Sequence, residues 1–358
     1  MIRKFPAGAQ GTCSSIVQAM QEANAVMVNR CRMLTEYGGE YVLQSAMLFE
    51  TIADRPSSHC ACITEAPDGD MLCVWYAGSR EAAPDVALML GRWRRATGQW
   101  DEPQLLLDTP GKPDGNAVLH CDPSGKLWLF HNVIEGRGWS DTRLYVRTSE
   151  DEGATWTDAE FFDPEVGRMV RTGMRVLSDG RWLLPAYDER SWQGLCYTSD
   201  DEGATWQCSE PMVAPVPLIQ PAIVERSDGS LLAYQRTGGD ERRIWASASQ
   251  DRGQTWSECI ATDLHNPNSG VDMVRLREGD LALVCNNVPK GRTPLHVAWS
   301  PDEGASWPII RELESIPGEF SYPTMLQAHD GLVHIVYTYQ RETIKHVWFD
   351  RAWLTGEA

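Results

Sequence analysis

A short segment recurs along this chain at nearly constant spacing. It has the form Ser-x-Asp-x-Gly-x-Thr/Ser-Trp, and its four well-formed copies carry the residues Asp151, Asp201, Asp251 and Asp302. A weaker copy ends at Trp100 and keeps only the Gly and the Trp. Because these copies stand about 50 residues apart, the pattern predicts one supersecondary unit repeated along the whole chain.

A second marker has a similar period. Six turns of the type Asp/Glu/Ser-Gly each join two apolar runs, as β-hairpin turns do. Their glycines are Gly69, Gly125, Gly180, Gly229, Gly279 and Gly331. Six units of several strands each predict an all-β fold, a six-bladed β-propeller of four-stranded antiparallel blades over residues 41–358. Residues 1–40 are expected to form an N-terminal extension with helix-like content.

The repeated box itself is expected to be structural. Its Asp can accept hydrogen bonds from backbone N–H groups of its own turn, its Gly allows a positive φ, and its Trp can fill the wedge beside the turn. In a meander of four strands, the boxes and the Gly turns lie at one end of the propeller. The last unit lacks a box, so a strand near residues 41–50 is expected to pair into the last blade and remove its open edge.

Composition excludes several functions. The formal net charge is −18, which disfavours a nucleic-acid partner and an anionic membrane surface. No His-Glu-x-x-His, EF-hand, Walker or dinucleotide motif occurs, so neither a metal nor a cofactor is expected. Ten scattered Cys, no secretory signal and no run of 18 apolar residues favour a cytoplasmic protein with free thiols.

Candidate site residues come from the register of the repeat. The positions nine residues before each turn glycine start the first strand of each unit, and in a propeller they converge on the mouth of the central channel. They are Cys60 with His59 beside it, Asn116, Arg171, Gln220, Gly270 and Tyr322. Most of them are hydrogen-bonding groups, whereas packing alone would favour small or apolar residues.

The loops at the same end between the second and third strands are polar as well. Their arginines are Arg80, Arg236, Arg242, Arg243 and Arg292. On an acidic chain, arginines gathered at one end indicate anion binding, because the guanidinium fork suits a carboxylate. Pairing of each arginine with nearby loop acids stays an alternative. Glu81 and Asp85 lie in the first of these loops, where one of them would act as a general acid.

The boxes, the blade period and the closing segment FSYPTMLQAHDGLVHIVYTYQ resemble the sialidase (neuraminidase) superfamily over about residues 50–354. In that family an arginine triad holds the substrate carboxylate, a Tyr activated by a Glu is the nucleophile, and an Asp of the first blade is the acid/base. The resemblance implies that Tyr322 is the nucleophile and Asp85 the acid/base. It also implies that Arg243, or its neighbour Arg242, is the second triad arginine and Arg292 the third.

Two positions depart from the family pattern. His59 stands where the family has its first-blade arginine, and Gln220 aligns with the Glu that activates the tyrosine. A glutamine cannot accept the proton that a tyrosine nucleophile must lose. Asp188 or Glu189 would then be the substitute base.

Three functions follow, and the first is a sialidase-like exo-glycosidase that hydrolyses a carboxylate-bearing sugar such as sialic acid. Here Arg171, Arg243 and Arg292 would clamp the anion. Tyr322 would be the nucleophile or an electrostatic stabiliser, and Asp85 the general acid.

The second is a lyase acting on a uronate polysaccharide. Arginine, Asn116 and Gln220 would neutralise the carboxylate, and His59 and Tyr322 would serve as base and acid for β-elimination. The third is a propeller that binds glycans without turnover. All three imply an anionic carbohydrate as the partner.

Overall fold

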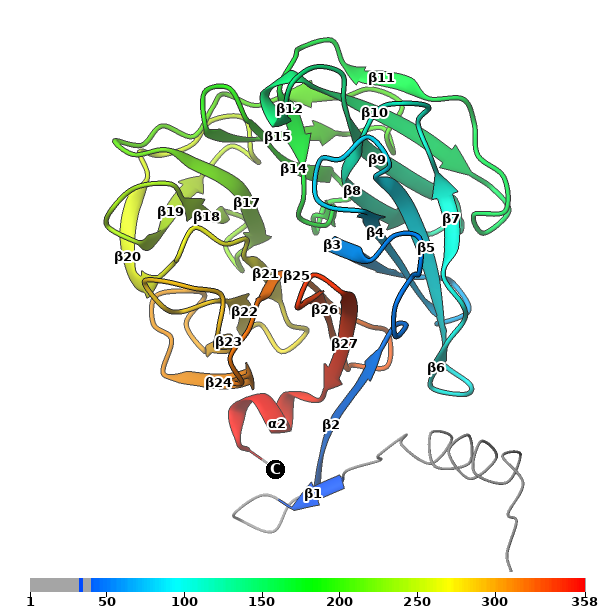
Figure 1. Ribbon diagram of the computed structural model, residues 1–358. Coiled ribbons are helices and arrows are strands. Elements are labelled where there is room, and N and C mark those ends of the chain that lie inside the picture. The colour runs from blue at the N-terminus through cyan, green and yellow to red at the C-terminus, as the bar shows by residue number, and fades with distance from the viewer. Residues whose placement is uncertain (1–31, 35–39, 358) are drawn as a thin grey trace, which may run out of the picture.

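A computed structural model describes residues 32–34 and 40–357, so nearly all of the expected extension lies outside the described residues. Six antiparallel sheets surround a central axis (Figure 1), which confirms the six-bladed β-propeller. The described part contains one 3-10 helix, η1 (Trp139–Asp141), and one α-helix, α2 (Arg351–Thr355), and is otherwise strands and loops.

Each blade is a meander whose first strand lies nearest the axis. The first blade consists of β3 (Ser57–Glu65), β4 (Met71–Gly78), β5 (Ala87–Arg94), β6 (Gln99–Trp100) and β7 (Gln104–Leu107). The second consists of β8 (Asp114–Cys121), β9 (Leu127–Ile134), β10 (Thr142–Ser149) and β11 (Glu160–Asp163). The third consists of β12 (Arg168–Val170), β13 (Arg175–Val176), β14 (Trp182–Asp188), β15 (Gln193–Ser199) and β16 (Gln207–Cys208).

The remaining blades repeat this plan. The fourth consists of β17 (Leu218–Glu225), β18 (Leu231–Thr237), β19 (Arg243–Ser249) and β20 (Ile260–His265). The fifth consists of β21 (Asp272–Arg275), β22 (Leu281–Cys285), β23 (Leu295–Ser300) and β24 (Ile309–Glu314). The sixth consists of β25 (Phe320–Gln327), β26 (Val333–Tyr339), β27 (Thr343–Phe349) and the early strands β2 (Glu40–Met47) and β1 (Arg32–Leu34).

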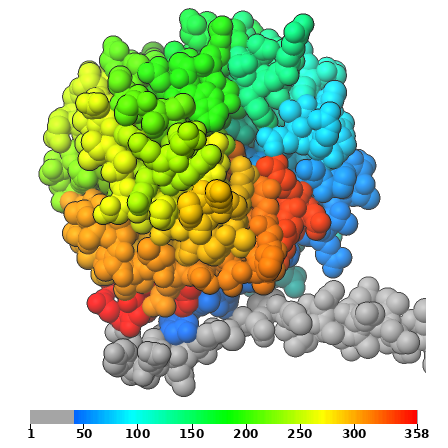
Figure 2. All heavy atoms as spheres, turned by 60° about the vertical axis from the view of Figure 1, so that its left-hand side comes forward, coloured from blue at the N-terminus to red at the C-terminus, as the bar shows by residue number. Residues whose placement is uncertain are grey.

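The ring closes as the sequence predicts. Strand β2 pairs antiparallel with β27, with Leu43 opposite Phe349. The Asp350 carboxylate fixes this junction, because it accepts hydrogen bonds from the backbone N–H of Val42 at 2.8 Å and of Trp353 at 2.8 Å. The first and last blades therefore lie side by side, as the blue and red segments show (Figure 1, Figure 2).

The repeated boxes form hydrogen-bonded turns. In the first, Ser149 Oγ donates to Asp151 at 2.8 Å, and the backbone N–H of Gly153 donates to Ser149 Oγ at 2.9 Å. The Asp151 carboxylate also accepts from the N–H of Thr155 at 2.8 Å, and the indole of Trp156 donates to Gly153 O at 3.0 Å. The serine and aspartate contacts recur in the other three boxes, at Asp201, Asp251 and Asp302.

These boxes also tie neighbouring blades together. The Glu303 carboxylate, in the box of the fifth blade, accepts from the backbone N–H of Ser227 at 2.7 Å, in the Gly turn of the fourth. Arg92 of the first blade pairs both with Asp68 in its own Gly turn and with Glu152 in the box of the second. Boxes and Gly turns therefore share one end of the propeller, and the opposite end is left for the loops.

Within residues 32–34 and 40–357, no group of three or more His, Cys, Asp or Glu side chains is arranged to hold a metal ion. No helix in that part of the chain is long and apolar enough to cross a membrane. The eight cysteines it contains are all free thiols.

Several histidines of the described chain are buried or half-buried and form no ion pair within it. His131 in β9 stacks on Tyr145 with ring centroids 5.5 Å apart, and within the described chain neither of its ring nitrogens has a hydrogen-bond partner. Burial lowers the pKa of His131 to about 3, and the pKa values of His120 and His334 to about 4. These side chains are neutral in the folded protein at neutral pH.

We predict that acid destabilises this fold through these histidines. Unfolding restores a pKa of about 6.5, so the unfolded chain binds more protons and stability falls as the pH drops below that value. At pH 5 the loss is about 2 kcal/mol for each such histidine. His131→Phe should therefore lose about 2 kcal/mol less than the wild type between pH 7 and pH 5 in urea unfolding. Equal losses in both proteins would contradict the prediction.

Candidate active site

The innermost strands are irregular where they face the channel mouth. β-Bulges interrupt the register at Cys60, Gln220 and Tyr322, whose φ angles are 58°, 58° and 52°. A similar shift occurs beside Asn116 in β8. A bulge bends the strand and changes the direction in which a side chain points, and bulges are common next to active sites. At Asn116, Gln220 and Tyr322, each nine residues before its turn glycine, this irregular backbone places the side chain at the channel mouth.

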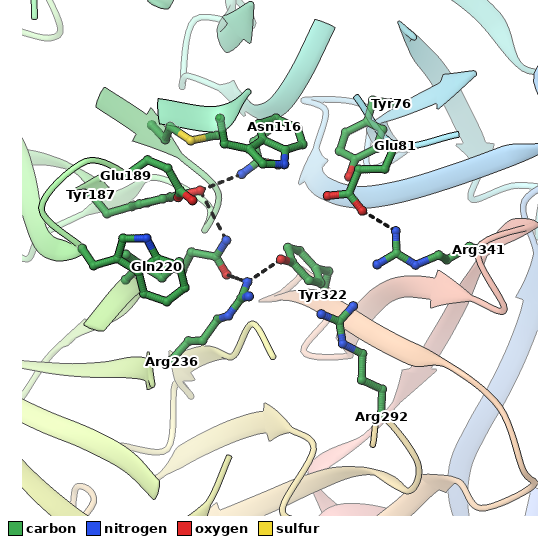
Figure 3. Close-up of a pocket in the computed structure, with 14 residues that line it drawn as sticks. Tyr76, Glu81, Asn116, Tyr187, Glu189, Gln220, Arg236, Arg292, Tyr322 and Arg341 are labelled. Atoms are coloured by element: carbon green, nitrogen blue, oxygen red, sulfur yellow. Dashed lines mark hydrogen bonds and ion pairs between the residues drawn. The ribbon is translucent and has the colours of Figure 1, made fainter. Parts of the chain in front are cut away.

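A pocket of about 250 Å³ opens at this end (Figure 3). Seven of the predicted residues line it, namely Glu81, Asn116, Glu189, Gln220, Arg236, Arg292 and Tyr322. The other lining residues are Tyr76, Trp139, Met169, Tyr187, Trp192, Ile219 and Arg341. The pocket thus joins three arginines, two glutamates and a group of aromatic side chains.

Tyr322 lies among the arginines at the centre of the pocket. Its side chain is 8% exposed, and Arg236 Nη1 donates a hydrogen bond to its hydroxyl. The Cζ atoms of Arg236 and Arg292 lie 5.5 and 5.3 Å from the ring centroid. The phenol oxygen is therefore held where negative charge on it would be stabilised.

A polar network fixes Arg236. Its guanidinium donates to Asn268 Oδ1 at 2.6 Å and to Gln220 Oε1 at 3.2 Å. The amide nitrogen of Gln220 in turn donates to the hydroxyl of Tyr187 at 3.3 Å, which also accepts from Asn116 Nδ2 at 3.0 Å. Because Gln220 uses one amide end as acceptor and the other as donor, it links Arg236 to Tyr187 in a way that a carboxylate could not.

Arg292 and Arg341 share one carboxylate. Glu319 accepts from Arg292 Nη1 at 2.6 Å and from Arg341 Nε at 2.8 Å, and Arg341 also pairs with Glu81. Burial raises the pKa of Glu319, but the hydrogen bonds and charges of the two arginines outweigh this and lower it. The Glu319 carboxylate thus holds two guanidinium groups side by side, and their charges favour its ionised form.

The position of Arg341 depends on a strained turn. It lies in the tight connection between β26 and β27, where Gln340 and Arg341 both adopt left-handed backbone angles, with φ of 57° and 60°. Two successive non-glycine residues in this region cost free energy, which is typical of functional sites. Sequence reasoning did not single out Arg341, although it stands on the loop of the sixth blade that matches the other arginine-bearing loops.

Glu189 is the least paired carboxylate of the pocket. It follows β14 directly, and its backbone N–H donates to Gly167 O at 2.9 Å. Within the described residues, no hydrogen bond or ion pair reaches its carboxylate. Burial raises the pKa of Glu189 to about 7, although the charge of Arg236 opposes the shift.

Two predicted residues lie behind the pocket instead of lining it. His59 is buried against Tyr322 with ring centroids 4.3 Å apart, and its Nδ1 lies 2.8 Å from Thr338 Oγ1. Burial, together with the charges of the nearby arginines, lowers the pKa of His59 well below its usual value. His59 is therefore a neutral ring that supports the tyrosine.

Arg171 crosses the centre of the propeller beneath Tyr322. It interrupts the innermost strand of the third blade between β12 and β13 and donates to Val271 O at 2.7 Å and to Pro323 O. A Cβ at Gly270 would lie 2.9 Å from its guanidinium carbon, so only glycine leaves it room. Arg171 thus joins the third blade to the fifth and sixth and is itself 1% exposed.

Three more predicted residues, Arg80, Asp85 and Arg243, do not line the pocket. The Asp85 carboxylate accepts from the N–H and the hydroxyl of Ser79, both at 2.9 Å, and so caps its own loop. Arg243 starts the third strand of its blade and donates to Asp263 O on the outermost strand. The arginines that line the pocket with Tyr322 are therefore Arg236, Arg292 and Arg341. Of the other two arginines expected to clamp the anion, Arg171 lies behind the pocket with its Cζ 5.4 Å from the Tyr322 ring centroid, and Arg243 faces an outer strand.

The repeated boxes and the six blades match a known repeat family. The family model described as "BNR repeat-like domain" matches residues 69–335. The chain belongs to this family, within the sialidase superfamily.

Relatives are distant. The anhydrosialidase of Macrobdella decora is 27% identical over 258 residues, which is 62% of this chain but only 33% of that protein. A leech intramolecular trans-sialidase complexed with 2,7-anhydro-Neu5Ac superposes with a TM-score of 0.73 at 16% identity, covering 88% of this chain and 71% of the other. The intramolecular trans-sialidase of Ruminococcus gnavus gives a TM-score of 0.72 at 15% identity, covering 86% and 97%.

The different positions of Arg171 and Arg243 predict different effects on stability. Arg171→Met removes the donor from two buried carbonyl groups, each costing about 1–3 kcal/mol, so we expect a loss of about 2–6 kcal/mol in urea unfolding. Arg243→Met changes a solvent-accessible contact and should cost less than about 1 kcal/mol. Similar losses in both variants would show that Arg171 does not brace the centre of the propeller.

Proposed function

We propose that this protein is an exo-glycosidase that hydrolyses the glycosidic bond of a carboxylate-bearing sugar such as sialic acid. The single observation that carries the proposal is the convergence of Arg236, Arg292 and Arg341 on Tyr322 in one pocket. Membership of the sialidase superfamily and the named activities of its relatives support the same reaction class.

The three arginines suit a carboxylate. Guanidinium groups bind carboxylates through paired N–H donors, and such charge-assisted bonds are about twice as strong as neutral ones. Glu319 holds Arg292 and Arg341 together, while Arg236 is fixed by the neutral side chains of Asn268 and Gln220. A substrate carboxylate would give Arg236 an anionic partner while sharing the other two with Glu319.

Tyr322 would be the nucleophile. The phenol must lose its proton as its oxygen bonds to the anomeric carbon, and Gln220 cannot take that proton. Arg236 instead donates to the phenol oxygen and would stabilise its developing negative charge. Electrostatic stabilisation by the arginines would thus replace the glutamate that the family pattern uses, in a mechanism where tyrosine takes the place of a nucleophilic carboxylate.

The position of His59 gives the lyase alternative less support than the glycosidase. His59 is 1% exposed, does not line the pocket, and has a pKa lowered mainly by burial. A protein that only bound glycans would need no nucleophile and would show no turnover. Turnover is therefore the outcome that separates the glycan-binding alternative from the proposal.

We predict that the wild-type protein releases free sugar from one or more members of a sialoside panel. It should give no unsaturated product, detected by absorbance, from uronate glycans. Tyr322→Phe should reduce turnover by at least about 10³-fold while keeping affinity for free sialic acid, because only the attacking oxygen is removed. Turnover that persists in Tyr322→Phe would contradict the nucleophile, and unsaturated product would favour the lyase. Mass spectrometry of the sugar separates hydrolysis from internal transfer, whose product lacks one water.

Arg341 should recognise the substrate carboxylate. Losing one charge-assisted hydrogen bond costs about 1.5–3 kcal/mol, so Arg341→Met should weaken binding of sialic acid about 10- to 150-fold in titration calorimetry. The methyl ester of the same sugar provides the control, because its affinity should change little. If the acid and the ester lost affinity equally, Arg341 would act through the shape of the pocket and not through the anion.

A further inference from the structure

We propose that Glu189 is the catalytic acid/base, giving a proton to the departing glycosidic oxygen and taking one back from the attacking water. This inference rests on the proposed glycosidase function. It moves the proton-transfer role from the first-blade loop that holds Glu81 and Asp85 to the end of β14 in the third blade.

The other nearby carboxylates are already engaged. Glu319 is held by Arg292 and Arg341, and Glu81 pairs with Arg341. An opposite charge in contact with a carboxylate favours its ionised form and so opposes its use as a proton donor. Asp85 does not line the pocket and is bound to Ser79.

Glu189 differs from these groups in its surroundings. It lines the same pocket as Tyr322, and in the described chain no guanidinium or amide donor touches its carboxylate. Burial raises its pKa to about 7, and the charge of Glu81 adds to this shift. A group with a pKa near the working pH can both give and take a proton, which is what an acid/base residue does in the two halves of a retaining reaction.

The position of Glu189 also suits the role. Its backbone N–H is bound to Gly167 O at 2.9 Å, and the preceding residues belong to β14, so the carboxylate extends from a fixed strand end. Tyr187 and Trp192, which precede and follow Glu189 in the sequence, also line the pocket. Figure 3 shows Glu189 and Tyr322 on different walls, with Glu81 and Arg341 opposite Glu189. A sugar between Glu189 and Tyr322 would meet an acid and a nucleophile at once.

The chemistry balances with these two groups. In the first half, the Tyr322 oxygen bonds to the anomeric carbon and the phenol proton passes to solvent. The glycosidic C–O bond breaks, its electron pair stays on the leaving oxygen, and that oxygen takes the proton of Glu189. In the second half, water adds to the anomeric carbon as the bond to Tyr322 breaks. Glu189 takes a proton from that water, and the phenolate regains one from solvent.

The test compares two substrates that share the sialosyl group but differ in leaving group. An alkyl sialoside such as sialyllactose needs a proton on its departing oxygen, whereas a 4-methylumbelliferyl sialoside departs without one. Glu189→Gln should lower kcat/KM for the alkyl substrate by about 10²- to 10⁴-fold and for the aryl substrate by less than about 10-fold. Retained aryl turnover also demonstrates that the variant is folded.

The pH profile provides a second readout. In the wild type, kcat/KM for the alkyl substrate should fall as the pH rises above about 7, because the free enzyme loses the Glu189 proton. Glu189→Gln should remove this limb. Glu241→Gln, the same change at an exposed glutamate on a loop of the fourth blade, is the matched control and should keep both the rate and the limb.

The outcomes separate the two proposals. If Glu189→Gln slows both substrates equally, or neither, Glu189 is not the acid/base, while the glycosidase proposal stands on the wild-type rate. If the wild type cleaves neither substrate, both proposals fail. Infrared spectroscopy tests the carboxyl group without turnover, because a protonated-carboxyl band titrating near pH 7 should be present in the wild type and absent in Glu189→Gln.

Discussion

The β-bulge in the innermost strands is the constraint on which the pocket depends. A strand that kept its regular pleat would turn alternate side chains into the packing between blades. The left-handed residues Cys60, Gln220 and Tyr322 break that alternation at the channel mouth. These backbone angles cost free energy. The rest of the scaffold offsets this, because its blades are tied together at the other end through contacts such as the one between Glu303 and Ser227.

The arginines near Tyr322 differ in the groups that they bind. The chain is acidic overall, yet four arginines gather around one tyrosine. Arg171 satisfies backbone carbonyl groups and braces the centre, whereas Glu319 holds Arg292 and Arg341 in place. Of the three arginines that line the pocket, Arg236 is the one whose partners in the described chain are all neutral, and it donates to the Tyr322 hydroxyl. The groups that each arginine already binds therefore distinguish the arginine that supports the fold from those that face a ligand.

The fold was predictable because the boxes and Gly turns are local signals with a fixed period, and the closing strand followed from the missing sheet edge. The spacing of the repeat also identified Tyr322 and Gln220 as candidate site residues, because each of their bulges lies nine residues before its turn glycine. It could not tell Arg243 from Arg341. The first faces an outer strand because of pairing with β20, and the second enters the pocket because of a tight turn. Likewise, the capping of Asp85 by Ser79 depends on the folded shape of their loop, and the lack of a partner for the Glu189 carboxylate in the described chain depends on how the blades come together.

Covalent trapping tests the central claim most directly. A fluorinated sialic acid with a good leaving group slows the second half of a retaining reaction more than the first, so the glycosyl-enzyme should accumulate. Mass spectrometry of the digested protein is predicted to find one sugar per chain, attached to Tyr322, and none in Tyr322→Phe. A label on another residue, or none while the natural sialoside is being cleaved, would contradict the account of this pocket.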